Sequence, residues 1–400
     1  MTFRVLAAIG VTAATTAACA DLSTGPRDTE DLVARFGLEP MPAMVFPVDN
    51  QPDPRRIELG KLLFFDPIQS AGFDVACSTC HLPDFGFADG RDLPIGPSGV
   101  GLGPDRELTR DDMVPEGRHS PTIINVGFNR FGEAVTADGF MFWDGRKRRL
   151  ENLTTLPQTE FSEMRGDAYP VEETTDTVLT RLRAIPEYEA LFREAFPENA
   201  AAVDRGERTS AVDSLAWAQS IAQFIRSVTS TDSRYDRFVA GDNEALTEQE
   251  KRGLVLFNSE RGDCYECHSG PMFSDFDFHV TGAKQLGPGF QLTPHEDLGR
   301  WNLTRLEQDK YKFRTPSLRN VAETAPYMHS GGYATLRDVL EFKNRGGGDH
   351  PLVSRERIEL EPRELTSEEM DDIIAFLRAL SDPPDVEVPT RVPSGLDVPR

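Results

Sequence analysis

Basic residues and long hydrophobic runs are both in short supply in this chain of 400 residues. There are 43 lysines and arginines against 66 acidic residues, a formal net charge of -23. That balance argues against nucleic acid or an anionic membrane surface as a partner and favours a basic partner protein. No stretch after the first twenty residues is long and apolar enough to cross a bilayer. No strong run of alternating residues predicts a β-sheet.

The first twenty residues differ from the rest. They combine one early arginine, a short apolar run and a small-residue exit, which predicts an export signal over 1–20 and a mature chain in the periplasm. The segment reaches an imperfect lipobox, "TAAC", in which Thr16 stands where a larger aliphatic residue is usual. Two alternatives stay open here, lipid anchoring through Cys19 and plain cleavage nearby.

Cysteine is also scarce, since only four remain once Cys19 is set aside, and these form two tight pairs. A histidine follows each pair directly. The two motifs are "CSTCH" with Cys77, Cys80 and His81, and "CYECH" with Cys264, Cys267 and His268. C-x-x-C-H is the attachment signature of c-type haem, in which the thiols bond to the porphyrin and the imidazole is the proximal iron ligand. Disulfides or zinc half-sites would leave both histidines unexplained. The sequence therefore predicts two covalently bound haems c.

The spacing of the motifs predicts an all-α fold of two cytochrome c-like helical haem domains with long wrapping loops. We place the N-terminal haem domain at 45–240, the C-terminal haem domain at 241–382 and a proline-rich tail at 383–400, which would be a surface strap or disordered. A helix precedes each haem motif, as a duplicated unit would leave. Capping boxes at Thr247/Glu250 and Thr366/Glu369 predict two helix starts.

A long amphipathic helix is predicted between the two motifs. Its apolar positions are Val212, Leu215, Ala218, Ala222 and Ile225.

A second set of motifs occurs in order across residues 45–380. These are "FADG", "RHSPTIIN", "FWDGR", "EFSEM", "KFRTPSLRNVAETAPYMHSGG" and "IIAFLRAL". By them the chain resembles the bacterial dihaem cytochrome c peroxidases, a family that also holds the MauG enzyme of methylamine utilisation. The resemblance implies that hydrogen peroxide reacts at the N-terminal haem and that the C-terminal haem relays electrons. A protein electron donor or a protein substrate would be the partner, and a homodimer is compatible with the family.

The resemblance also implies the residues above the N-terminal iron. Glu163 would move a proton from the inner to the outer peroxide oxygen, and Trp143 would relay electrons between the haems. Pro157 matches a wall residue of the MauG branch, while Leu153 stands where a glutamine is expected, which makes the pocket drier. His119 is out of register for capping the iron, so we favour a hydrogen-bonding role for it over ligation.

A calcium site is implied by the same resemblance. Its ligands would be Asn125 and the backbone carbonyls of Thr324 and Pro326, since calcium accepts neutral oxygens. Four other histidines match no iron-ligand position. We assign His329 and His279 to the surroundings of the second haem, and His295 and His350 to loops.

Lys343 raises a separate question. The segment 335–344 predicts a helix with Leu336, Val339 and Leu340 on one face, and Lys343 is the next position on that face. Fourteen positions after His329, the peroxidases have methionine and MauG has tyrosine as the sixth ligand of the second haem, and here the count reaches Lys343. The alternatives are Met328, an open iron, or a lysine that snorkels from the helix end.

These observations leave three hypotheses. The first is a MauG-like enzyme that oxidises a partner protein, and the second is a peroxidase that uses a small cytochrome or cupredoxin as donor. The third is a non-enzymatic electron carrier or redox sensor, and Glu163 over an unligated iron argues against it.

Overall fold

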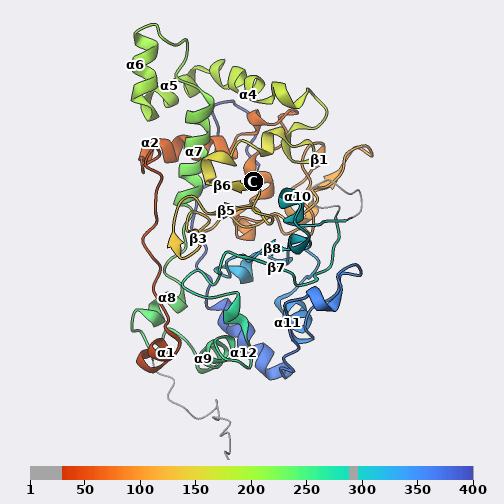
Figure 1. The fold of residues 1–400 in the computed structure, drawn as a ribbon. Helices are drawn as coiled ribbons and strands as arrows, with labels where there is room; N and C mark the ends of the chain where they lie inside the picture. Colours follow the sequence, from red (N-terminus) through yellow and green to blue (C-terminus); the bar gives the residue numbers. More distant parts are fainter. Residues whose placement is uncertain (1–28, 288–295, 400) are drawn as a thin grey trace, which may run out of the picture.

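The computed structural model describes residues 29–287 and 296–399, and Figure 1 shows its course. Helices joined by long irregular loops make up most of it. The helices are α1 Thr29–Phe36, α2 Pro54–Phe65, α3 Cys77–Cys80, α4 Thr174–Arg183, α5 Pro186–Ala195, α6 Pro197–Asp204, α7 Ser214–Ser227, α8 Arg234–Val239, α9 Glu248–Phe257, α10 Trp301–Thr304, α11 Leu336–Asn344 and α12 Ser367–Arg378. Short 3-10 turns interrupt the loops.

In the described ranges, strands are present only as antiparallel pairs of two-residue strands. The antiparallel pairs are β1 Gly99–Val100 with β2 Glu107–Leu108, β3 Arg130–Phe131 with β4 Ala134–Val135, β5 Phe140–Met141 with β6 Lys147–Arg148, and β7 Phe278–His279 with β8 Phe313–Arg314. Figure 1 shows β3 and β5 to β8 between an upper and a lower group of helices. The prediction of a mainly helical chain is confirmed, and the paired strands are additions to it.

The first hydrophobic core is built around the crossing of α2 and α7. Gly60 of α2 lies so close to α7 that a Cβ there would come within 1.9 Å of the Ser220 carbonyl oxygen. One turn further along each helix, Phe64 and Phe224 meet with their ring centroids 5.0 Å apart. A glycine at the crossing point therefore brings the two helix backbones into contact and lets the aromatic rings pack beside it.

The second hydrophobic core repeats this arrangement with α9 and α12. A Cβ on Gly253 would come within 2.0 Å of the Asp372 carbonyl oxygen. Phe257 and Phe376, four residues further along, have ring centroids 5.3 Å apart. The spacing of glycine and phenylalanine is the same in both cores, and each glycine-bearing helix leads into one C-x-x-C-H motif.

The N-terminal helix α1 packs in the second core, and the C-terminal tail packs in the first. Leu32 of α1 is buried in the second core, and so are Tyr235 and Phe238 of α8. The change of core thus comes before residue 234, ahead of the boundary at 240 that the sequence suggested. The tail returns to the first core, where Val392 is fully buried and other apolar tail residues pack around it.

Several local predictions can be compared with the structure. The capping boxes at Thr247/Glu250 and Thr366/Glu369 are confirmed, and Thr335 opens α11 in the same way. The apolar face predicted for α7 is wrong in part: Leu215 is 58 % exposed, and Val212 precedes the N-cap Asp213.

No helix in the described ranges is long and apolar enough to span a membrane. The predicted export signal, Cys19 and His295 lie outside the described residues.

Candidate functional site

The two C-x-x-C-H motifs present their histidines in the same way. The Nδ1 of His81 lies 3.0 Å from the Phe87 carbonyl oxygen, and that of His268 lies 2.9 Å from the Phe273 carbonyl oxygen. With Nδ1 donating to a carbonyl, Nε2 is the unprotonated nitrogen and is left to bind a metal. Burial lowers the pKa of both imidazoles, that of His268 to about 4, with the charge of Lys343 as a further cause.

The four thiols of the motifs are free in the structure. No disulfide joins Cys77, Cys80, Cys264 and Cys267. Burial raises the pKa of Cys77 and of Cys264 to about 12. Neutral, unpaired thiols beside a neutral imidazole form the donor set that covalent haem attachment requires.

Glu163 lies on a π-helical turn, Phe161–Arg165, of the kind often found at functional sites. A neighbouring loop is pressed against this turn, since a Cβ on Gly96 would come within 2.0 Å of the Ser162 carbonyl oxygen. Buried Arg106 holds that loop by donating to the carbonyls of Ile95 and Gly96, each at 2.7 Å. The loop that carries Gly96 therefore holds the turn at 161–165 in place.

The Glu163 carboxylate lies within electrostatic reach of the first haem motif. Its negative charge contributes, after burial, to raising the pKa of Cys77 and of Cys80. The pKa of Glu163 itself is raised to about 8, first by burial and then by the negative charge of Glu116, while Arg146 opposes the shift. A carboxyl group with such a pKa can both accept and return a proton near neutral pH.

Glu116 is a second acidic residue near this turn, and no sequence motif marks it. Burial raises its pKa, contact with the Ser162 side chain lowers it, and Glu160 raises it further. Its Oε1 is buried without a hydrogen-bond partner. Two carboxyl groups therefore share the region around the turn at 161–165.

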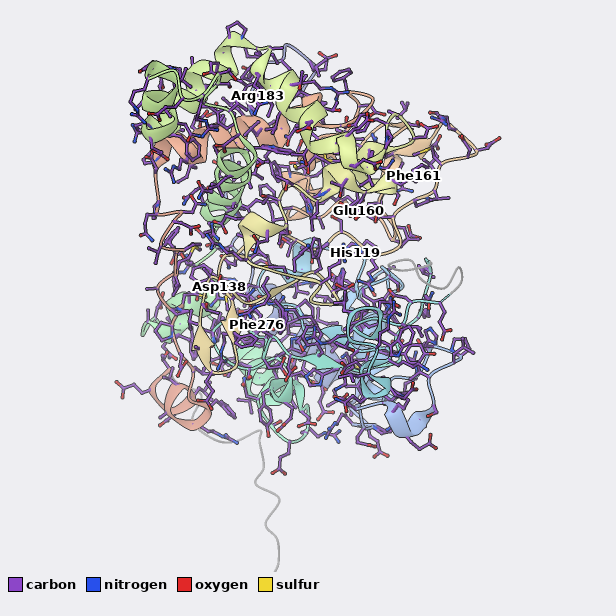
Figure 2. The ribbon with its side chains drawn as sticks, turned by 45° about the horizontal axis from the view of Figure 1, so that its top comes forward. His119, Asp138, Glu160, Phe161, Arg183 and Phe276 are labelled. Carbon is purple, nitrogen blue, oxygen red and sulfur yellow. The ribbon has the colours of Figure 1, made fainter. Side chains whose placement is uncertain are left out.

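Trp143 lies where the N-terminal and C-terminal parts of the chain are linked by hydrogen bonds. Its Nε1 donates to the carbonyl of His119 at 2.9 Å, and the amide of His119 donates to the carbonyl of His329 at 2.9 Å. The carbonyl of Trp143 accepts from the amide of Arg314 in β8 at 2.7 Å. Figure 2 shows His119 between the ribbon carrying Glu160 and Phe161 and the C-terminal ribbon below.

Buried charges reinforce this junction. The Arg118 guanidinium pairs with Asp144 at 2.7 Å and with Asp297 at 2.6 Å, and all three side chains are buried. The ring of His329 stacks on Phe313 with centroids 3.6 Å apart. Fully paired charges and a stacked ring hold the segment at 118–119 in one position.

The amine of Lys343 lies within electrostatic reach of the second haem motif. Its positive charge lowers the pKa of Cys264 and of His268, in the first case against the effect of burial. Burial lowers the pKa of Lys343 itself. In the described part of the chain, the amine has no hydrogen bond or ion pair. An amine without a partner, within electrostatic reach of a thiol and imidazole site, has the chemistry of a metal ligand.

The comparisons with known proteins agree with this geometry. Residues 54–244 match the family model described as di-haem cytochrome c peroxidase. The methylamine utilization protein MauG of Methylorubrum extorquens is 33% identical over 380 residues, covering 94% of this chain and 92% of that protein.

This chain belongs to the di-haem cytochrome c peroxidase family. Cytochrome c551 peroxidase of Pseudomonas aeruginosa is 32% identical over 365 residues, covering 91% of this chain and 90% of that protein. A crystal structure of a MauG-like protein associated with microbial copper homeostasis superposes with a TM-score of 0.68 at 29% identity, covering 86% of this chain and 93% of that chain.

Membership of a di-haem family assigns the two motifs to two haems c. The free thiols, the oriented imidazoles and the amine of Lys343 fit that assignment. The protein is a peroxidase-type oxidoreductase. It has a carboxyl group near the first C-x-x-C-H motif and an amine near the second, so the two haem sites differ in chemistry.

Other residues that the peroxidase resemblance singled out have definite contacts. The Nδ1 of His119 lies 2.8 Å from the carbonyl of Arg91, and burial lowers the pKa of its imidazole to about 4. Leu153 packs partly buried against the first core, and Pro157 opens a 3-10 turn. Met328 packs at the edge of the second core.

Two of the residues predicted to bind calcium have contacts of their own. The side chain of Asn125 donates to the carbonyl of Ser230 at 2.7 Å and accepts from its amide at 2.8 Å. The side-chain methyl group of Thr324 lies beside Gly86.

Proposed function

We propose that this protein is a periplasmic dihaem enzyme that reduces hydrogen peroxide at the N-terminal haem, with electrons supplied through the C-terminal haem. The two haem domains, predicted at 45–240 and 241–382, would each be built on one glycine-centred helix crossing, with the change between them before residue 234. The observation that carries the proposal is Glu163, a carboxyl group held on a fixed turn within electrostatic reach of the first C-x-x-C-H motif, with its pKa raised to about 8.

The chain holds the haems through Cys77, Cys80 and His81 at the first site and through Cys264, Cys267 and His268 at the second. When bound, haem supplies an iron that binds peroxide and exchanges single electrons. Glu163 takes a proton from the inner oxygen of peroxide and delivers it to the outer oxygen, which leaves as water. Completing the reaction consumes two electrons and two protons in total and gives two waters. Leu153, apolar where the family has an amide, keeps the pocket dry.

Trp143 is the proposed electron relay between the haems. Its hydrogen bonds reach His119 on one side and Arg314 of β8 on the other, so it is positioned by both halves of the chain. An indole with both its ring nitrogen and its backbone engaged keeps one orientation, which electron transfer at a fixed distance needs.

Lys343 is the proposed sixth ligand of the second iron. An amine donor favours the ferric state more than a thioether does, so this haem would have a low reduction potential. Replacing Lys343 by Met should raise the second haem's potential and change its ligand-field spectrum. Unchanged potential and spin state would remove Lys343 from the iron.

The electron donor divides the two enzymatic hypotheses. A low-potential second haem favours the MauG-like alternative, in which the diferric protein reacts with peroxide and a partner protein is oxidised. The net charge of -23 supports the other candidate, a small basic cytochrome or cupredoxin that is drawn to an acidic surface. Mixing peroxide-treated protein with a reduced basic cytochrome c tests the second candidate directly.

Three further features belong to the proposal. A calcium ion would sit at Asn125, Thr324 and Pro326, and treatment with EGTA would then slow turnover. The export signal would place the protein in the periplasm, with Cys19 as a lipid anchor if it is acylated. Sedimentation of the holoprotein would distinguish a monomer from a homodimer.

The central test is the reaction of the fully ferric holoprotein with peroxide. The haem spectrum should change at once in the parent protein, whereas Glu163→Gln should bind both haems and react at least about 100-fold more slowly. Glu173→Gln, an exposed glutamate replaced by its amide, is the control and should react normally. A fully active Glu163→Gln variant would disprove the proposed role of Glu163.

A further inference from the structure

His279 is held between two carboxylates. Its Nε2 lies 2.8 Å from Asp275 Oδ2, and its Nδ1 lies 2.6 Å from Glu359 Oε2. A ring nitrogen must carry a proton to donate to a carboxylate, so both nitrogens are protonated and the imidazole is a cation. The pKa of His279 is raised to about 12 by Asp275, then by Cys267 and Glu359, which agrees with a permanent charge.

This charged triad lies at the point where the second haem is attached. Ligand atoms of Cys267, Asp275 and His279 all lie within 4.8 Å of one another. The amide of Asp275 also donates to the carbonyl of Cys267 at 2.8 Å. Once Cys267 has formed its thioether it is no longer a thiolate, so the group is not a metal site in the holoprotein. It is a set of fixed charges beside the haem edge.

The backbone keeps the triad in place. His279 belongs to β7, paired with β8, and the amide of Glu359 donates to the carbonyl of Val280 at 2.9 Å. Two further cations attract the carboxylates of the triad: Lys312 interacts with Glu359, and Arg314 interacts with Asp275. Asp275 is therefore held by the haem motif itself, whereas His279 is held by β7 and Glu359 by its backbone contact with Val280.

We propose that the triad of Asp275, His279 and Glu359 controls the reduction potential of the second haem through its charges beside the Cys267 thioether. This inference rests on the proposed function, because it requires a haem at Cys264 and Cys267. A negative charge near the iron favours the ferric state and a positive charge favours the ferrous state. The triad itself carries two negative charges and one positive charge, so its own net charge stabilises the ferric haem in the same direction as Lys343, and Lys312 and Arg314 partly offset this effect.

Single charge-removing substitutions should move the potential in opposite directions. His279→Gln removes the cation and should lower the second haem's potential. Asp275→Asn and Glu359→Gln each remove an anion and should raise it. A tenfold change in the ferric-to-ferrous ratio corresponds to about 59 mV for one electron, and we expect Asp275→Asn to approach that shift. Glu359 is 41 % exposed, so solvent screening should make its effect smaller.

The experiment is a spectroelectrochemical titration of the full-length diferric holoprotein and its variants. The first haem's potential and Glu173→Gln are the controls, and neither should change. A purely structural triad would give shifts of one sign in all three variants, or none, and either result overturns the inference. If His279→Gln does not fold, a lowered potential in Asp275→Asn or in the exposed Glu359→Gln variant overturns the inference.

Intact mass measured on the same samples separates the two levels of the argument. Two attached haems with unmoved potentials would overturn the role of the triad alone. A mass showing no second haem would overturn the proposed function as well.

Discussion

Two carboxyl groups, Glu163 and Glu116, would control proton chemistry at the first haem site in the proposed reaction. Each is buried near the turn at 161–165, and Glu116 raises the pKa of Glu163. Glu116 Oε1 has no hydrogen-bond partner, while Ser162, the charge of Arg146 and the backbone of Gly117 lower the pKa of this carboxyl group against the effect of burial. The charge state of Glu116 therefore decides how readily Glu163 gives up its proton.

Removing the charge of Glu116 should shift the pH dependence of the peroxide reaction. Glu163 accepts a proton only as the carboxylate, so with a pKa of about 8 the rate should rise with pH up to about that value. Glu116→Gln lowers this pKa and should move the midpoint of the profile to lower pH, which raises the rate at pH 7. Stopped-flow mixing across pH 5–10 measures the shift.

Glu160→Gln provides a graded comparison for that measurement. Glu160 raises the pKa of Glu163 less than Glu116 does, so its removal should give a smaller shift in the same direction. A profile that stays in place in Glu116→Gln would show that Glu116 does not act on the reacting group.

At the level of residues, the haem ligands could be predicted from sequence because C-x-x-C-H places thiols and imidazole within one turn of chain. Glu116 could not, because its partner Glu163 is 47 positions away and only the fold brings the two together. The buried ion pair of Arg118 with Asp297 could not be predicted for the same reason, because the two residues lie far apart in the sequence. No local pattern marks a contact of this kind.

Among the elements, the crossings of α2 with α7 and of α9 with α12 depend on one glycine each. Either Gly60→Ala or Gly253→Ala would place a methyl group within about 2 Å of a backbone carbonyl oxygen. Because backbone cannot move aside as a side chain can, the helices must separate and the aromatic pair beside them loosens.

We expect Gly60→Ala and Gly253→Ala each to destabilise its own core by about 1–3 kcal/mol or more. Chemical denaturation followed through the two haem spectra should show loss at the first haem for Gly60→Ala and at the second for Gly253→Ala. Glu58→Ala, on the exposed side of α2, is the matched control and should be nearly neutral. Equal losses at both haems would contradict two separate cores.

Helix starts were predictable because a capping box is a local contact between residues three apart, as at Thr247 and Glu250. The buried face of α7 was less predictable. It is formed by residues such as Trp217, Ile221 and Phe224, and packing against α2 rather than apolar character selects them over Leu215. The paired strands have two residues each, which is too short to give an alternating pattern of polar and apolar residues.

Over the whole molecule, the C-terminal tail belongs to the first core. Ser394 Oγ donates to Asp66 Oδ1 at 2.7 Å, and Asp66 also accepts from the hydroxyl of Tyr188 at 2.6 Å. Val392 is fully buried there. The tail is therefore a packed strap, attached to the part of the chain that begins more than three hundred residues earlier.

Val392→Ala should destabilise the first core by about 2 kcal/mol, because it removes buried methyl groups and leaves a cavity. Thermal unfolding followed at the first haem's absorption measures the loss, and the second haem should respond less. Asp397→Ala, an exposed residue of the same tail, should have little effect. If Val392→Ala weakened only the second haem's surroundings, the strap would not be part of the first core.

The packing of α1 in the second core and of the tail in the first also bears on how the protein is made. The first core lacks Val392 until the chain is almost complete, while the second core needs Leu32 from near its start. In the proposed export from N-terminus to C-terminus, the thiols at 77 and 80 would emerge long before their surroundings could close. Haem would then be joined to an open first site, which the last residues to be delivered would seal.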